Sequence, residues 1–206
     1  MMSSQNKTFG DIYSDKEVHS GSPKGLCYNE DLDMENKFKQ IAGIIARATD
    51  RVAPTILDVG CGYSTLLSVY DKFHKYTGVD TTEWIHKAAE ATADTVYGGT
   101  DRREDIKHHL GTLSTVDKKL TPTYDVVMAI GVMATMNREI AKDFMQELAA
   151  KAGKFLVLGY QSVELSNYHG SLNSQTFDEV REATGMRVVE IQTIPDTTEI
   201  LVLLSK

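Results

Sequence analysis

A glycine turn with an acid in front of it is the part of the sequence best suited to chemistry. Residues 55–65 read T-I-L-D-V-G-C-G-Y-S-T, so an apolar run carries Asp58 and is followed by Gly60 and Gly62. Glycine accepts the positive φ angles and the close backbone approach that such a turn needs. The residues from Ser64 suit a helix whose free N–H groups face a ligand. This pattern places a nucleotide-like ligand at the carboxyl end of a parallel sheet.

A second acid follows at the distance that a ribose site requires. Asp80 closes the apolar segment Tyr76–Asp80 and lies 20 residues beyond Gly60. An acid at the end of the second strand can accept two hydrogen bonds from ribose hydroxyls. Alternatively, Asp80 is the N-cap of the following helix, although Thr81 and Thr82 could also fill that position. We favour ribose binding, because the position and the strand end coincide.

The residues around the turn separate two classes of nucleotide site. A dinucleotide fingerprint has a third glycine or alanine where this sequence has Thr65, and an apolar residue where it has Asp58. The stretch instead resembles motif I of the class I S-adenosylmethionine-dependent methyltransferases. In that family the ligand carries a sulfonium and an ammonium group, which a nearby carboxylate complements. The resemblance implies S-adenosylmethionine as the cofactor, held by Asp58, Gly60, Cys61, Gly62, Asp80, Thr81, Thr112, Leu113 and Ile130.

The elements that must position these residues alternate along the chain. Hydrophobic periodicity predicts helices from Asp33 and over 64–74, 83–92, 137–151 and 175–183, and strands over 55–59, 76–80, 106–110, 124–130, 154–160, 187–193 and 199–205. Alternating strands and helices predict a doubly wound α/β fold. The short link between the last two strands predicts an antiparallel hairpin. The resemblance implies the same seven-stranded, mostly parallel, Rossmann-like sheet with its last strand reversed.

Departures from family motifs bear on the substrate. The family often places an acid after the third strand to meet the adenine amino group, and this sequence has Gly111-Thr112 there. The fourth strand lacks the Asn- or Asp-Pro-Pro-aromatic motif of enzymes that methylate DNA amino groups, and no Pro-Cys nucleophile follows it. Some small-molecule members carry Glu-His where this sequence has Ala134-Thr135. The fourth strand ends in Ala129-Ile130-Gly131-Val132 before a helix, a pattern that resembles members acting on small molecules, so we expect a small-molecule acceptor with a reactive oxygen or nitrogen.

Two histidines are candidate general bases. His19 lies in residues 1–28, which we expect to form a flexible segment and possible active-site lid ahead of a methyltransferase domain over 29–206. His169 follows the fifth strand, at the edge of the sheet where substrates approach. A surface-loop histidine is the simpler interpretation of either residue. Positioning and desolvation can supply most of the acceleration of methyl transfer, so a strong catalytic signature is not required.

Composition narrows the partners. The 206 residues suit one domain, and a net charge of −7 does not favour nucleic acid, since Arg102-Arg103 is flanked by acids. No apolar run is long enough to span a membrane, and the first residues lack the apolar core of a secretory signal. Two cysteines without metal-ligand spacing predict no metal and a cytoplasmic protein. The oligomeric state is left open.

Three functions remain in view. The first is an S-adenosylmethionine-dependent methyltransferase that acts on a small molecule. The second is a binding or regulatory module that keeps the fold without the reaction, which Thr112 in place of an acid favours. The third is an NAD-linked oxidoreductase, which Asp58, Thr65 and the lack of a Tyr-x-x-x-Lys pair disfavour.

Overall fold

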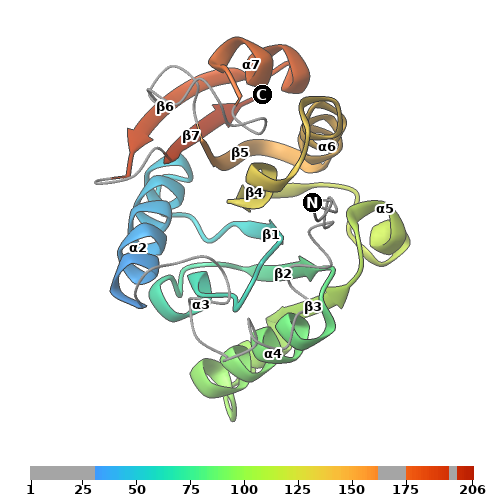
Figure 1. Cartoon of the computed structure of the whole chain (residues 1–206). Coiled ribbons are helices and arrows are strands. Elements are labelled where there is room, and N and C mark those ends of the chain that lie inside the picture. The colour runs from blue at the N-terminus through green and yellow to red at the C-terminus, as the bar shows by residue number, and fades with distance from the viewer. Residues whose placement is uncertain (1–30, 162–174, 195–198) are drawn as a thin grey trace, which may run out of the picture.

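A seven-stranded sheet forms the centre of the molecule (Figure 1). The computed structural model describes residues 31–161, 175–194 and 199–206. The strand order is β3-β2-β1-β4-β5-β7-β6. The strands are β1 (Thr55–Val59), β2 (Lys75–Asp80), β3 (Ile106–Leu110), β4 (Tyr124–Ile130), β5 (Ala152–Gln161), β6 (Arg187–Thr193) and β7 (Glu199–Ser205).

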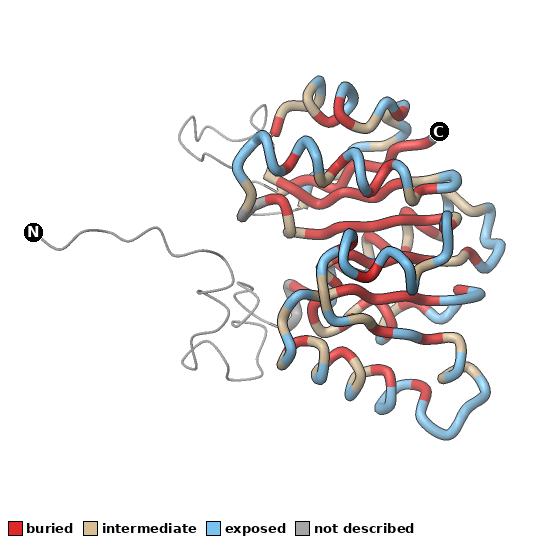
Figure 2. Tube along the Cα trace, turned by 90° about the vertical axis from the view of Figure 1, so that its right-hand side faces the viewer, coloured by how far each residue is buried: buried red, intermediate tan, exposed pale blue. Residues whose placement is uncertain are grey.

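Six strands run in the same direction, and only β7 is reversed, between β5 and β6. The pairs β1–β2, β1–β4, β2–β3 and β4–β5 are parallel, whereas β7 is antiparallel to both β5 and β6. Strands that are covered on both faces can be apolar throughout. The central strands accordingly have nearly continuous burial, which Figure 2 shows as red segments inside a paler shell of helices. The predicted doubly wound α/β sheet with a C-terminal antiparallel hairpin is confirmed.

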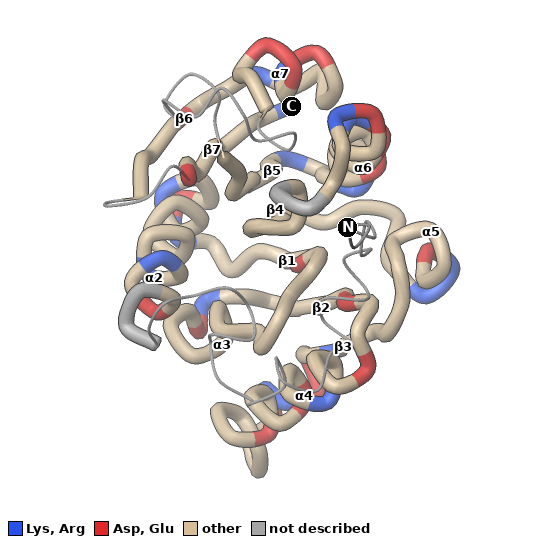
Figure 3. Tube along the Cα trace, viewed as in Figure 1, with Lys and Arg blue, Asp and Glu red and all other residues tan. Residues whose placement is uncertain are grey.

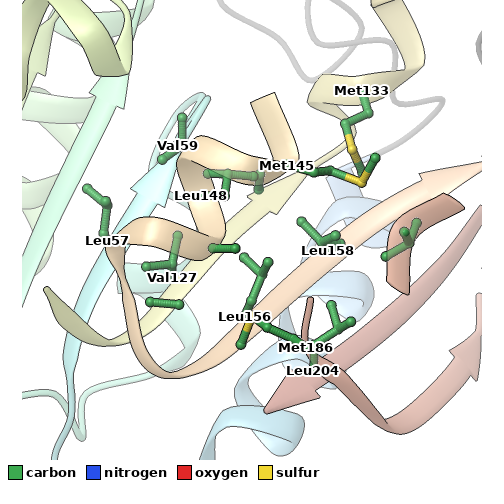
Figure 4. Packing of buried hydrophobic residues seen from close by; sticks show 14 of the residues in the cluster. Leu57, Val59, Val127, Met133, Met145, Leu148, Leu156, Leu158, Met186 and Leu204 are labelled. Atoms are coloured by element: carbon green, nitrogen blue, oxygen red, sulfur yellow. The ribbon is translucent and has the colours of Figure 1, made fainter. Parts of the chain in front are cut away.

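Helices cover both faces of the sheet. They are α2 (Asp31–Ala48), α3 (Leu66–Val69), α4 (Glu83–Tyr97), α5 (Leu113–Val116), α6 (Arg138–Lys151) and α7 (Phe177–Thr184), with short 3₁₀ turns η3 (Asp101–Asp105), η4 (Asp117–Lys119) and η5 (Val132–Thr135). One apolar core lies between the sheet and α2, α3 and α4. The other lies under α5, α6 and α7, where side chains from β1, β4 and β5 meet those of α6 (Figure 4).

Two predicted helices end elsewhere than expected. The helix predicted over 64–74 is the single turn of α3, because Ser64 is left-handed (φ 55°) and Tyr70 is already extended. The helix predicted over 83–92 continues to Tyr97. Its buried residues Ile85, Ala89, Ala93 and Tyr97 recur every four positions, and the Tyr97 hydroxyl donates to the Leu67 carbonyl at 3.1 Å. Burial of this tyrosine therefore outweighs the weak helix propensity of the intervening threonines.

Charged residues lie mostly on the outer helices and at the edges of the molecule, as Figure 3 shows. Among the helices that the structure describes, none is long and apolar enough to cross a membrane. The predicted flexible segment at residues 1–28 lies outside the described residues.

Candidate cofactor and active site

A cavity of about 430 Å³ opens at the carboxyl ends of β1, β2, β3 and β4. Parallel strands end together at this edge of a doubly wound sheet, so the loops that follow them converge there. Residues of the turn after β1, the loop after β2 and the loop after β3 form one part of the wall. Residues of α2, η5 and α6 form the rest. All the predicted cofactor residues except Asp58 line this cavity.

The glycine turn has the conformation that its sequence predicts. Gly60 and Gly62 have φ angles of 69° and 54°. A Cβ atom on Gly60 would lie 2.3 Å from Cγ2 of Val132, so η5 packs directly on the turn. The backbone N–H groups of Gly60 and Cys61 both donate to the Val79 carbonyl, at 2.8 and 3.1 Å, and this fixes the turn to the end of β2. Only glycine meets both demands at position 60.

Asp80 connects the turn to the loop after β2. Its carboxylate accepts hydrogen bonds from the backbone N–H of Gly62 at 3.2 Å and of Thr82 at 3.0 Å. Burial raises the pKa of this carboxyl, against the hydrogen bonds from the backbone. The N-cap of α4 is Thr82 and not Asp80, but Asp80 accepts a hydrogen bond from the N–H of Thr82 and so helps to position the start of the helix. A carboxylate with two oxygens still has lone pairs for further donors.

The loop after β3 forms the opposite part of this wall. Gly111 has a φ of 143°, and Thr112 caps α5 by accepting from the N–H of Thr115 at 3.3 Å. The Thr112 hydroxyl also lies 3.0 Å from that of Ser114, so its oxygen is already engaged within the loop. Leu113 is buried under the cavity. The threonine in place of the family's acid therefore works as a helix cap.

Asp58 lies behind the turn rather than on the cavity wall. It is buried, and it accepts a hydrogen bond from the Tyr76 hydroxyl at 2.7 Å. Burial raises the pKa of Asp58 to about 7, and the negative charge of Asp80 adds to the rise while the Tyr76 hydrogen bond opposes it. The structure thus does not bring Asp58 into the contact with a ligand that the sequence suggested. Any effect of Asp58 on a bound cation acts through the electric field across the turn.

The rest of the cavity wall is largely apolar, and the sequence did not identify it as part of a site. Met34 and Phe38 of α2 lie on the face that also forms the core, and Ile140 and Phe144 belong to α6. Ile130 ends β4 beside them. The only signal in the sequence is helical spacing, which marks buried faces without telling a core from a pocket.

The candidate bases His19 and His169 lie outside the described residues. Among the described wall residues there is no histidine; those that ionise are Cys61, Tyr63, Asp80 and Glu147. In the described part of the chain no three acidic, histidine or cysteine side chains gather in a way that could hold a metal ion.

Comparison with known proteins identifies the architecture. No protein-family model and no curated protein sequence matches the chain. Solved structures do match. They include the magnesium protoporphyrin IX methyltransferase of Synechocystis PCC 6803 with bound S-adenosylmethionine, at a TM-score of 0.69 and 14% identity over 85% of this chain and 80% of that one. They also include the N-methyltransferase NodS of Bradyrhizobium japonicum WM9, at a TM-score of 0.63 and 10% identity over 86% and 98%. A third is a putative O-methyltransferase of Nostoc punctiforme PCC 73102, at a TM-score of 0.65 and 14% identity. That match covers 84% of this chain and 56% of the other. The strand order, the reversed β7 and these matches show that the chain has the fold of the class I S-adenosylmethionine-dependent methyltransferases.

Proposed function

We propose that the protein is an S-adenosylmethionine-dependent methyltransferase whose acceptor is an oxygen or nitrogen atom of a small molecule. The observation that carries the proposal is the meeting of the glycine turn, Asp80 and the Gly111–Leu113 loop around one cavity. The solved neighbours add support, since one holds S-adenosylmethionine and another was crystallised with apigenin. The net charge of −7 gives no support to a nucleic-acid acceptor.

The residues of the wall fit the parts of this cofactor. The bare backbone at Gly60 and Gly62 allows close approach of the methionine portion, and Asp80 can accept from the ribose hydroxyls. The adenine ring would lie against the apolar side chains of Leu113 and Ile130, and the hydroxyl of Thr81 adds a polar group to the same wall. When bound, S-adenosylmethionine supplies an electrophilic methyl group on a good leaving group. The work left to the protein is to position the acceptor, exclude water and accept a proton.

His19 and His169 stay our candidates for the group that accepts this proton. In the sequence, His19 precedes α2 and His169 follows β5. A neutral imidazole has one ring nitrogen with a free lone pair, which can accept the acceptor's proton. Replacing each by glutamine should lower kcat by about 10²-fold or more if it removes the acceptor's proton.

Calorimetry tests the cofactor, and product formation tests the reaction. S-adenosylmethionine and S-adenosylhomocysteine should bind, whereas NAD should give no heat; binding of NAD alone would favour the oxidoreductase instead. Incubation with a panel of phenols, carboxylic acids and amines should then release S-adenosylhomocysteine. A protein that binds the cofactor but methylates nothing across a broad panel would point to a regulatory module, the alternative that the cap role of Thr112 leaves open.

A further inference from the structure

A row of residues crosses three strands directly beneath the glycine turn. Asp58 of β1 pairs with Gly78 of β2, and Gly78 pairs with His108 of β3. Residues in register on neighbouring parallel strands point to the same face of a sheet. A Cβ on Gly78 would lie 2.5 Å from Cδ2 of His108 and 3.0 Å from Sγ of Cys61. The missing side chain at position 78 therefore makes room for an imidazole under the turn.

Hydrogen bonds join the two ends of this row. The Tyr76 hydroxyl lies 2.7 Å from Asp58 and 3.2 Å from the hydroxyl of Ser64. The Ser64 oxygen lies 2.8 Å from Nε2 of His108, whose Nδ1 lies 2.9 Å from Glu90 of α4. We call these five residues the buried relay. Ser64, fully buried, has a left-handed backbone that costs about 1–3 kcal/mol in a residue other than glycine. The hydrogen bonds of its hydroxyl with Tyr76 and His108 offset that cost, and the Cys61 thiol bonds to the same hydroxyl.

The pairing of Ser64 with His108 and Glu90 has the form of a hydrolytic triad, but it cannot act as one. The serine has no exposed surface, and its oxygen is shared with Tyr76. A nucleophile must reach its substrate, so this arrangement is part of the protein interior. What the buried relay can do is hold and move a proton.

Two arrangements of protons along the buried relay give every one of its hydrogen bonds a donor and an acceptor. Each hydroxyl has a single proton to donate, and a carboxylate can only accept. If Tyr76 donates to an ionised Asp58, Ser64 donates to Tyr76, and His108 must then donate from both nitrogens as an imidazolium. If Asp58 is protonated and donates to Tyr76, the direction of each hydroxyl's hydrogen bond is reversed. Tyr76 then donates to Ser64, and Ser64 donates to Nε2 of a neutral His108. The two arrangements hold the same number of protons.

We propose that a cationic ligand bound above the glycine turn draws one proton from Asp58 to His108 along the intervening hydroxyl groups. The proton leaves the Asp58 carboxyl for the Tyr76 oxygen. Tyr76 passes its own proton to Ser64, which passes its proton to Nε2 of His108. No bond between heavy atoms changes. The ligand gains a carboxylate behind the turn, and the new imidazolium is stabilised by Glu90.

The surroundings of both ends favour the neutral arrangement before a ligand binds. Burial raises the pKa of Asp58, and the charge of Asp80 on β2 adds to this. The Cys61 thiol and Tyr76 are the other ionisable groups at that end, and burial raises the pKa of each.

At the other end, burial lowers the pKa of His108, while Glu90 of α4 opposes this. His86 of α4 and Arg103 of η3 are the remaining charged or ionisable groups that act on the imidazole, and both lower its pKa. Arg103 itself pairs with Glu90 and Asp94. A positive charge above the turn reverses the balance, because it favours an anionic Asp58.

The inference rests on the proposed function, because S-adenosylmethionine is the cation that it assumes. The test is ¹⁵N NMR of the imidazole of His108 in the full chain at pH 7. Without ligand we expect the neutral form with its proton on Nδ1, and with saturating S-adenosylmethionine the imidazolium. S-adenosylhomocysteine lacks the sulfonium charge and should leave the ring neutral. A neutral His108 with S-adenosylmethionine bound would overturn the inference, whereas absence of any binding would overturn the proposed function.

Two variants separate a relay from a merely structural cluster. Tyr76→Phe removes the hydroxyl next to Asp58, so the imidazole should stay neutral, and the proton should instead appear in solution as a buffer-dependent binding heat. Tyr97→Phe is the matched control. It is a second buried tyrosine of the same core, whose hydroxyl bonds to the Leu67 carbonyl outside the buried relay. In Tyr97→Phe the change of His108 should match the wild type; formation of the imidazolium in Tyr76→Phe would also contradict the proposal.

Discussion

At the scale of single residues, Asp80 is the group on which the proposed cofactor site most depends. It holds Gly62 and Thr82 by their N–H groups and faces the cavity. Asp80→Asn should weaken binding of S-adenosylmethionine by roughly 1–3 kcal/mol, because buried hydroxyls lose a charged acceptor. Calorimetry measures the change. Asp71→Asn, an exposed acid outside the cavity wall, is the control and should bind as the wild type does. Equal affinity in the two variants would remove Asp80 from the ribose site.

Asp58 predicts how stability depends on pH. Its folded pKa of about 7 lies above the value of about 3.8 expected when unfolded, so the protonated carboxyl favours the folded state. That contribution is complete below about pH 4 and is lost as the pH rises through 7. Asp58→Asn should therefore gain about 2–3 kcal/mol of stability relative to the wild type between pH 5 and pH 8. Urea denaturation without ligand at both pH values measures it. A difference between the two proteins that does not change with pH would contradict the raised pKa.

The same residue shows what sequence reasoning could and could not reach. The types and spacing of Asp58, Gly60, Gly62 and Asp80 predicted a ligand turn, and the structure brings three of the four to one cavity. Asp58 faces inward instead, because its side chain points to the sheet face that Tyr76 and α3 cover. Which face of a strand a residue occupies follows from register with its neighbours. The buried relay was missed for the same reason, since Ser64 and His108 are 44 positions apart.

At the scale of elements, α7 allows a test of local sequence signals. Thr176 and Glu179 form a capping box, with Thr176 accepting from the Glu179 N–H at 3.1 Å, and Gly185 ends the helix in a left-handed conformation. Thr176→Ala should lower the free energy of unfolding by about 1 kcal/mol, because the first turn loses an acceptor.

Urea unfolding measures the loss, and binding of S-adenosylmethionine should not change, because α7 does not line the cavity. Thr184→Ala is the matched control at the other end of the helix, where the hydroxyl donates to the Val180 carbonyl and accepts only a long hydrogen bond, 3.3 Å, from the Met186 N–H. It should cost less than about 0.5 kcal/mol. An equal cost at both ends would mean that the cap adds nothing specific.

Strands were predicted more accurately than helices, for a physical reason. β1, β3, β4, β6 and β7 begin and end where the sequence placed them. β1 and β4 are parallel strands covered on both faces, so each is a short, mostly apolar run. Helix ends depend on distant contacts. The ring of Phe73 packs edge-on against the ring of Tyr97, with 5.8 Å between the ring centroids. The helix α3 ends at Val69, and the extended chain that follows brings the Phe73 ring into the core. Nothing local in residues 64–74 carries this information.

At the scale of the whole molecule, two ion pairs join α2 to the C-terminal hairpin across the sheet. Lys37 lies 2.6 Å from Glu199 of β7, and their side chains are only 4% and 20% exposed. Arg47 lies 2.7 Å from Glu190 of β6, and these side chains are 56% and 30% exposed. Lys37 precedes Phe38 in α2, so the first pair holds in place a helix that contributes Met34 and Phe38 to the apolar part of the wall.

These two pairs should differ widely in strength, because burial decides how much an ion pair contributes. Lys37→Met leaves a carboxylate in a poorly hydrated place and should cost about 2–4 kcal/mol. Arg47→Met breaks a solvated pair on the same helix and should cost less than about 1 kcal/mol. Double-mutant cycles with Glu199→Gln and Glu190→Gln measure each coupling in urea. Only the Lys37 variant should also weaken S-adenosylmethionine binding, since Lys37 lies between Met34 and Phe38, which line the cavity, whereas Arg47 lies near the other end of α2. Coupling energies near zero for both pairs would show that α2 is held to the sheet by its apolar face alone.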